Sequence, residues 1–208
     1  MAKNLTTISI YHITQIANLQ AILQMNRLLS DAAMIRQNHN TSPIGDTEIK
    51  RRRLHDIQID CPPYKNVGEF VPFYYCPRSP MLYRINKGGT GLNPGCQKDI
   101  VHLVSNVQLA TNCGQPWVIA DGNAGAYHTS FTDQLAGLHS LNWAAINSRY
   151  WSQVMHQKQA EFLVLDYYAW TNITSIGCYD NPAAQKVGAI VRTSAHQPSI
   201  NKMPGWYF

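Results

Sequence analysis

The sequence predicts an α+β fold in a single domain that spans residues 1–208. Segments rich in β-branched and aromatic residues, typical of short strands, alternate with segments whose apolar residues recur at helical spacing. The distances between these segments are irregular, which favours α+β over the regular winding of a parallel βαβ sheet. The length of 208 residues suits one sizeable core, and the Pro and Gly breakers are not gathered in one linker.

The first predicted strand covers residues 7–11, which are mostly β-branched or aromatic. Apolar residues at positions 16, 19, 22 and 23 then predict a helix. Thr14 is placed to cap its start, and Asn26 is placed to end it in a left-handed conformation. Residues 30–43 are polar and aperiodic, so a loop is expected there. Asp46 is placed to cap a short helix that carries the basic residues at positions 50–53.

The later elements follow from apolar runs between turn signals. Further strands are expected at residues 70–76, 100–104, 117–120, 160–165, 173–178 and 187–191. Helical segments are expected near residues 135–138 and 143–150, and residues 121–125 form a loop by composition.

Composition excludes several classes of protein. Hydrophobic residues make up 45% and charged residues 14%, which is typical of a globular chain and not of a disordered one. No stretch approaches the roughly 20 apolar residues of a membrane helix, and residues 1–5 lack the long apolar core of a secretory signal. The five cysteines include no C-x-x-C pair. We therefore expect a cytoplasmic protein that has no membrane partner, no disulfide framework and no metal.

The net charge of +5 favours a polyanionic partner, since Lys and Arg neutralise phosphates irrespective of sequence. Four consecutive cations at positions 50–53 strengthen this interpretation, although a solvated basic turn is the simpler alternative. The glycine-rich run at positions 88–91 lacks the Lys-Ser or Lys-Thr of a phosphate loop and is expected to be a flexible loop. The chain also lacks a G-x-S-x-G elbow and an H-E-x-x-H zinc helix.

Four segments set polar residues tightly among apolar ones: residues 11–14, 49–53, 71–83 and 159–164. Each has a structural alternative. His12 is explained equally by a hydrogen-bonded core histidine, Arg78 by a loop anchor, and Glu161 by an edge carboxylate that faces water.

Taken together, these segments resemble the DarT toxins, the DNA ADP-ribosyltransferases of bacterial toxin–antitoxin pairs. The resemblance runs from about Ile10 to Phe208, and its most specific motifs are Pro-Arg-Ser-Pro-Met-Leu at 77–82 and Gln-Ala-Glu-Phe at 159–162. Within the family, the thymidine-modifying branch is a better match than the guanosine-modifying one.

The resemblance implies an ADP-ribosyltransferase-like fold: a split, mostly antiparallel β core with flanking helices and NAD in the cleft between its halves. It implies NAD as a consumed co-substrate, single-stranded DNA as acceptor, and a cognate antitoxin with ADP-ribosyl hydrolase activity as partner. Carried over by position, the catalytic residues are Arg53 and Glu161. The residues expected at NAD are His12, Ile13, Thr14, Ala21, Leu29 and Arg53. At Asn123 the sequence departs from the family pattern, which often has a histidine there.

The transfer of ADP-ribose from NAD to a base requires a carboxylate and benefits from a guanidinium. Breaking the nicotinamide–ribose bond builds positive charge on the sugar, which the Glu161 carboxylate would stabilise in the transition state. Thymine N3 lies in the Watson–Crick pair, so a single-stranded or flipped base is required. The resemblance implies Arg53 as the acceptor of the N3 proton. A guanidinium stays protonated up to a pH of about 12. An alternative is therefore that Arg53 donates hydrogen bonds to the thymine anion while Glu161 or water takes the proton.

The DNA itself would be held by cations and by rings on which bases stack. The candidates are Arg51, Arg52, Arg78, Arg84, Tyr150 and Trp151.

Three alternative functions remain open on the sequence. One is a DNA ADP-ribosyltransferase that modifies guanosine. Another is a transferase of the same fold that modifies protein side chains, or an RNA 2′-phosphotransferase. The third is a basic module that binds nucleic acid without catalysis.

Overall fold

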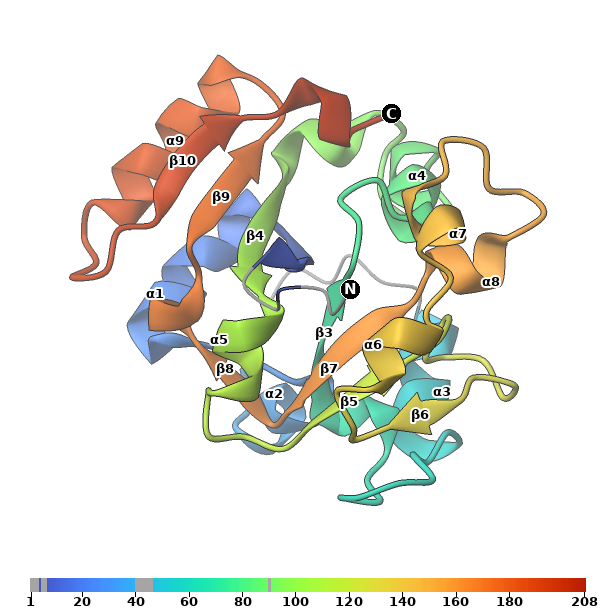
Figure 1. Ribbon diagram of the computed structural model, residues 1–208. Coiled ribbons are helices and arrows are strands. Elements are labelled where there is room, and N and C mark those ends of the chain that lie inside the picture. Colours follow the sequence, from blue (N-terminus) through green and yellow to red (C-terminus); the bar gives the residue numbers. More distant parts are fainter. Residues whose placement is uncertain (1–3, 5–6, 40–46, 90) are drawn as a thin grey trace.

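The computed structural model describes residue 4 and residues 7–39, 47–89 and 91–208. Its centre is an 8-stranded sheet with the order β10-β9-β4-β1-β3-β7-β5-β6 (Figure 1). The strands are β1 (Ser9–Gln15), β3 (Phe70–Tyr74), β4 (Ile100–Asn106), β5 (Trp117–Ala120), β6 (Phe131–Thr132), β7 (Glu161–Leu165), β9 (Ser175–Cys178) and β10 (Ser199–Lys202). All neighbours are antiparallel except β9 and β10, which confirms the expected α+β fold with a mostly antiparallel core.

Helices flank this sheet on both sides. They are α1 (Leu19–Met25), α2 (Asp31–Arg36), α3 (Thr47–His55), α4 (Pro80–Asn86), α5 (Val107–Thr111), α6 (Gly137–Ser140), α7 (Trp143–Asn147), α8 (Met155–Lys158) and α9 (Asn181–Val191). A second, two-stranded sheet joins β2 (Arg27–Leu29) to β8 (Tyr167–Ala169). None of the helices in the described part of the chain is long and apolar enough to span a membrane.

The large sheet is split between β1 and β3. These two strands are paired at a single position, Tyr11 opposite Tyr74, whereas β1 pairs with β4 along its whole length from Ser9 to Gln15. At the next residue of β1 the link to β3 is a side-chain one, because His12 Nδ1 lies 2.9 Å from the carbonyl of Pro72. The expected split of the β core is confirmed.

The core lies under the centre of this sheet. Ile10, Phe73, Leu103 and Phe162 come from four different strands and are fully buried. Phe73 also contacts Tyr168 edge to face, with ring centroids 4.9 Å apart, which joins the small sheet to the large one. Both walls of the split are therefore anchored in packed apolar side chains.

The strand predicted at residues 187–191 is wrong, because this segment is the second half of α9. Asp180 caps α9 by accepting a hydrogen bond from the backbone of Ala183, and Ala183, Val187 and Val191 are buried at four-residue spacing. The helix connects β9 to β10, and a parallel pair of strands needs such a crossover.

Several other local expectations need correction. Residues 30–43 were expected to form a loop, but α2 lies within them, capped by Ser30, whose hydroxyl accepts from the backbone of Ala33.

Thr14 does not cap a helix: it lies in β1, where its hydroxyl accepts a hydrogen bond from the Asn18 side chain. Asn26 does end α1 in the left-handed conformation, with φ 51°. The basic run lies on α3 as expected, while Asp46 lies outside the described residues.

Candidate active site

A cavity of about 520 Å³ opens where the sheet splits. His12, Ile13 and Thr14 of β1 line one wall, and Pro72 and Tyr74 of β3 line the other. Side chains of α1, α2, α3 and α4, of the small-sheet strand β2, of the loop at Asn123 and of the segment before β7 also line the cavity. The cavity is therefore built from chain segments far apart in sequence that the sheet brings together.

Arg53 and Glu161 form a two-point ion pair at this cavity. Arg53 Nη1 lies 3.2 Å from Glu161 Oε1, and Nη2 lies 3.0 Å from Oε2. The backbone N–H of Ala124 donates a third hydrogen bond to Oε1 at 3.2 Å. The Glu161 side chain is 1% exposed, against 12% for Arg53, and only Arg53 of the two is among the described residues that line the cavity. In this state the guanidinium screens the carboxylate from the cavity.

The sheet dictates the place of Glu161. It is the first residue of β7, where it pairs with Tyr74 of β3 on one side and with Ala120 of β5 on the other. Arg53 reaches it from the last turn of α3. Burial alone lowers the pKa of Arg53, but the charge and hydrogen bonds of Glu161 outweigh burial and raise that pKa above its ordinary value. Arg53 is therefore a permanent cation.

His12 and Tyr74 are both neutral. Burial lowers the pKa of His12 and outweighs the hydrogen bond to Pro72 and the charge of Asp31, which act to raise that pKa. Because its Nδ1 lies 2.9 Å from the carbonyl of Pro72, which can only accept, Nδ1 carries the proton and Nε2 is left as an acceptor. Burial, followed by the charge of Glu161, raises the pKa of Tyr74, so the phenol keeps its proton. Its hydroxyl donates to the sulfur of Met81 at 3.5 Å.

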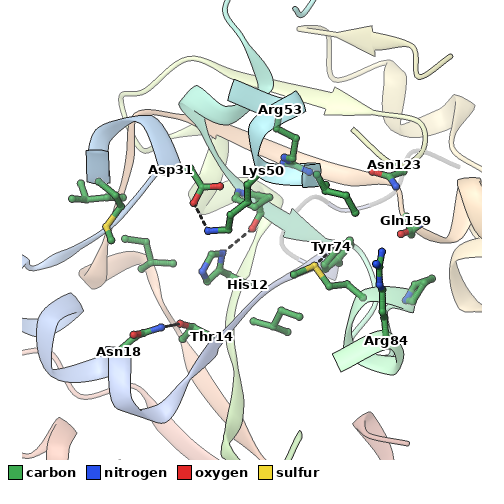
Figure 2. A pocket seen from close by; sticks show the side chains of 18 of the residues that line it. His12, Thr14, Asn18, Asp31, Lys50, Arg53, Tyr74, Arg84, Asn123 and Gln159 are labelled. Carbon is green, nitrogen blue, oxygen red and sulfur yellow. Dashed lines mark hydrogen bonds and ion pairs between the residues drawn. The ribbon is translucent and has the colours of Figure 1, made fainter. Parts of the chain in front are cut away.

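Lys50 and Asp31 form a second ion pair across the cavity, from α3 to α2. Lys50 Nζ lies 2.7 Å from Asp31 Oδ1, and both side chains line the cavity and are about one third exposed. Figure 2 shows this pair above His12, with Arg53 on the same helix as Lys50. Cations of α3 thus meet the cavity at two successive turns.

The structure brings most of the residues expected at NAD to one place. His12, Ile13, Thr14, Leu29 and Arg53 all line the cavity. Ala21 is half-buried on α1 and is not among the described lining residues, although its neighbour Ile22 is.

The residues expected at DNA are spread more widely. Arg84 and Trp151 line the outer part of the cavity, where Trp151 contacts Tyr83 edge to face. Arg78 lies over the ring of Phe208, 4.5 Å from its centre, and Tyr150 is 87% exposed.

Arg51 pairs with Glu48 and Asp56 on the surface. Arg52 instead donates to the carbonyl of Gly125.

Sequence reasoning missed Lys50, Asp31 and the amide of Ala124. Helical periodicity was the available signal for Lys50, because positions 49, 50 and 53 share one face of α3 and line the cavity, while position 51 faces solvent. Nothing in the sequence marks a backbone amide as a hydrogen-bond donor to a distant carboxylate.

Known proteins with similar sequences and structures agree on one family. The family described as "ssDNA thymidine ADP-ribosyltransferase, DarT" matches residues 11–208. A DNA ADP-ribosyl transferase of Thermus sp. (strain 2.9) is 37% identical over 209 residues, covering 96% of this chain and 95% of its own length.

Solved structures extend the match. Thermus sp. 2.9 DarT in complex with ADP-ribosylated ssDNA has a TM-score of 0.91 at 35% identity, covering 97% of this chain and 96% of that one. The same protein in complex with NAD+ has a TM-score of 0.87 at 33% identity, with both chains fully covered. A fusion of a DNA ADP-ribosyl transferase with a DNA ADP-ribosyl glycohydrolase from Thermosipho africanus is 32% identical over 120 residues, which are 58% of this chain and 28% of the fusion.

NAD as the expected co-substrate is confirmed at the level of the family by the NAD+ complex. The split sheet, the buried carboxylate–guanidinium pair and the matched sequence over residues 11–208 lead to one assignment. This chain belongs to the DarT family of NAD-dependent DNA ADP-ribosyltransferases.

Proposed function

We propose that the chain transfers the ADP-ribose of NAD to N3 of thymidine in single-stranded DNA and releases nicotinamide. The observation that carries this proposal is the ion pair of Arg53 and Glu161 at the wall of the cavity in the split sheet. In this proposal Glu161 and Arg53 are the catalytic residues.

The cavity suggests how NAD would lie. The diphosphate is anionic and would contact Lys50, exchanging with Asp31 as its partner. The Nε2 acceptor of His12 suits a ribose hydroxyl, with Ile13, Thr14, Ala21 and Leu29 along the dinucleotide. The apolar wall of Ile22, Leu28 and Met34 suits the adenine ring. The nicotinamide ribose would then lie next to Arg53 and Glu161.

Glycosyl transfer needs the carboxylate to face the sugar. The bond from C1′ to nicotinamide breaks with its electron pair going to nicotinamide, a bond from C1′ to thymine N3 forms, and N3 loses its proton. The Glu161 carboxylate stabilises the positive charge that builds on the ribose between these events. Because Arg53 screens the carboxylate in the present structure, its two hydrogen bonds must exchange when the substrates are bound.

Arg53 has two possible parts in the loss of the N3 proton. The raised pKa of Arg53 favours a role in which Arg53 donates hydrogen bonds to the thymine anion, while Glu161 or water accepts the proton. Both assignments predict that Arg53→Ala is inactive. They differ in Arg53→Lys: an unchanged pH–rate profile with a low rate supports the donor, whereas a new limb near the pKa of lysine supports proton transfer at this position.

The acceptor strand would enter from the outer end of the cavity. Trp151 offers a ring for base stacking, and Arg84 offers a cation at the same end. Arg78 and Tyr150 would extend this path over the surface, with Arg51 of α3 on the other side. The neighbour solved with ADP-ribosylated ssDNA supports a single-stranded acceptor.

The biological setting is a toxin in the cytoplasm, where NAD and DNA are both present, paired with an antitoxin that removes the modification. The fusion relative, which unites transferase and glycohydrolase in one chain, supports this pairing.

The test is incubation with labelled NAD and a panel of acceptors. Oligonucleotides with thymidine as the variable base, with guanosine in its place, or with N3-methylthymidine are compared with RNA and with bulk protein. We expect label on the thymidine oligonucleotide alone. Label on guanosine, on N3-methylthymidine, on RNA or on protein would contradict the proposed acceptor.

A further inference from the structure

Two neighbouring arginines of α3 reach the same carboxylate by different routes. Arg53 binds Glu161 directly. Arg52 donates from Nη2 to the backbone carbonyl of Gly125 at 2.8 Å, and Gly125 directly follows Ala124, whose N–H donates to Glu161 Oε1. The third hydrogen bond on the carboxylate therefore lies one residue from the carbonyl that Arg52 holds.

The loop that carries this amide is held from two sides: its own hydrogen bonds and the buried side chain of Ala124 on one side, and α3 on the other. Residues 121–125 belong to no helix or strand. Within the turn, the side chain of Asn123 accepts from the backbone of Gly125 at 2.8 Å, and Thr129 donates to the carbonyl of Asn123. A Cβ at Gly125 would lie 3.2 Å from the Asn123 side chain within the turn and in ordinary contact, at 3.7 Å, with Arg53 Cγ of α3. The turn thus lies beside α3, and Arg52 is the side chain of α3 that bonds to its backbone.

The environment of Arg52 differs from that of a phosphate-binding arginine. Its Nε is buried, and its guanidinium lies 5.9 Å from the centre of the Tyr127 ring, on the same loop. Arg51 is half exposed by comparison and pairs with two surface carboxylates. Arg52 is consequently turned toward the protein, where one of its nitrogens is out of reach of a DNA phosphate.

We propose that Arg52 is a positioning residue: it clasps the turn at residues 123–125 onto α3 and so keeps the Ala124 amide on the Glu161 carboxylate. This reassigns Arg52 from the DNA-contacting role expected from the sequence. The inference rests on the proposed function for its kinetic consequence, because the clasp matters for rate only if Glu161 is catalytic.

The clasp predicts a loss in kcat without a loss of DNA affinity. Without Arg52 the turn loses its hydrogen bond to α3, and the Ala124 amide, one of the three donors that fix the orientation of Glu161, is held less firmly. Misplacement of a catalytic group on this scale typically costs about ten- to hundredfold in rate. A lost phosphate contact would instead raise the KM for DNA and make its salt dependence shallower.

The experiment compares Arg52→Gln and Arg52→Lys with Arg36→Gln, which removes an exposed arginine from its ion pair with Asp166 and serves as control. We expect Arg52→Gln to lower kcat about ten- to hundredfold with an unchanged KM for DNA and an unchanged salt dependence. Arg52→Lys retains one cationic donor and should restore part of kcat. Arg36→Gln should match wild type. An unchanged kcat with a raised KM for DNA would overturn the proposal.

Hydrogen–deuterium exchange of the peptide covering residues 121–126 tests the clasp without any substrate. Exchange should be faster in Arg52→Gln than in wild type and in Arg36→Gln. If the wild-type chain modified no DNA, the proposed function would be wrong. The exchange rates would still show whether Arg52 holds the turn. Equal exchange in all three proteins would refute the clasp whatever the activity.

Discussion

The ionisation of single residues in the cavity follows from their immediate neighbours. Glu161 keeps Arg53 charged despite burial, while burial keeps His12 neutral. One wall therefore offers a permanent donor and the other a permanent acceptor at neutral pH. This pairing suits a substrate that carries both anionic phosphates and ribose hydroxyls.

Lys50→Met tests the contact proposed with the diphosphate. The substitution keeps most of the side-chain volume but removes the charge, so the KM for NAD should rise about tenfold while kcat changes little. Steady-state rates of nicotinamide release at varied NAD measure this. Lys65→Met is the control, because Lys65 is half exposed and lies 4.0 Å from Glu69 on the surface. An unchanged KM for NAD in Lys50→Met would place the diphosphate elsewhere.

The site role of a residue could be predicted where the residue stands in a recognisable motif. It could not be predicted where the role depends only on the direction in which the side chain points. Glu161 and Arg53 stand in recognisable segments, and the structure brings them within hydrogen-bond distance. Lys50 and Arg52 stand in the same basic run, yet only the orientation of α3 shows that Lys50 faces the cavity and Arg52 faces a loop. Helical periodicity divides this run of cations between faces, but it does not say which face meets the cavity.

Among the elements, α3 determines the site because it carries Lys50, Arg52 and Arg53. It packs against the segment before β3, where Gly68 allows the two backbones to approach. A Cβ at Gly68 would lie 2.9 Å from Leu54 Cα, and a backbone atom cannot step aside as a flexible side chain can. The position of α3 therefore depends on a glycine outside the cavity.

Gly68→Ala should displace α3 and so impair the site from a distance. We expect a loss of stability of about 1–3 kcal/mol from overpacking, together with a lower kcat because Arg53 moves with the helix. Thermal unfolding and nicotinamide release report the two effects. Gly205→Ala is the matched control, since a Cβ there meets nothing within 4 Å. Wild-type activity in Gly68→Ala would show that α3 tolerates the shift.

Element prediction succeeded where periodicity was clear and failed where an apolar run fits two structures. The segment at 187–191 reads as a strand by composition, but the buried positions of α9 repeat every four residues from Ala183 onward. The short strands β2 and β8 were missed because their pairing joins residues 27–29 to residues 167–169. Such a contact is set by tertiary structure and leaves no local pattern.

For the whole molecule, a titratable side chain buried in the sheet away from the cavity links stability to pH. His102 on β4 is fully buried, its Nε2 donates to the carbonyl of Pro77, and burial lowers its pKa from 6.5 to about 4. The unfolded chain binds this proton more tightly than the folded one. The stabilisation by neutral His102 is thus complete above pH 6.5 and is lost as the pH falls toward about 4.

His102→Gln should flatten this dependence, because glutamine retains a donor but does not titrate. Between pH 7 and pH 4 the wild-type protein should lose about 3 kcal/mol more unfolding free energy than the variant. Urea unfolding at a series of pH values measures the difference, with the exposed His139→Gln as control. Parallel curves for wild type and His102→Gln would mean that His102 takes no part.

If the buried carboxylate at the split of the sheet drives ADP-ribose transfer to DNA, Glu161→Gln should abolish most of the activity. The substitution preserves shape and removes charge. Mass spectrometry of a thymidine oligonucleotide incubated with NAD should show the gain of one ADP-ribose with wild-type enzyme. With Glu161→Gln the rate should fall by about a thousandfold or more, while NAD binding stays within a few-fold of wild type. Modification by Glu161→Gln at a rate close to that of wild type would show that the carboxylate does not drive the transfer.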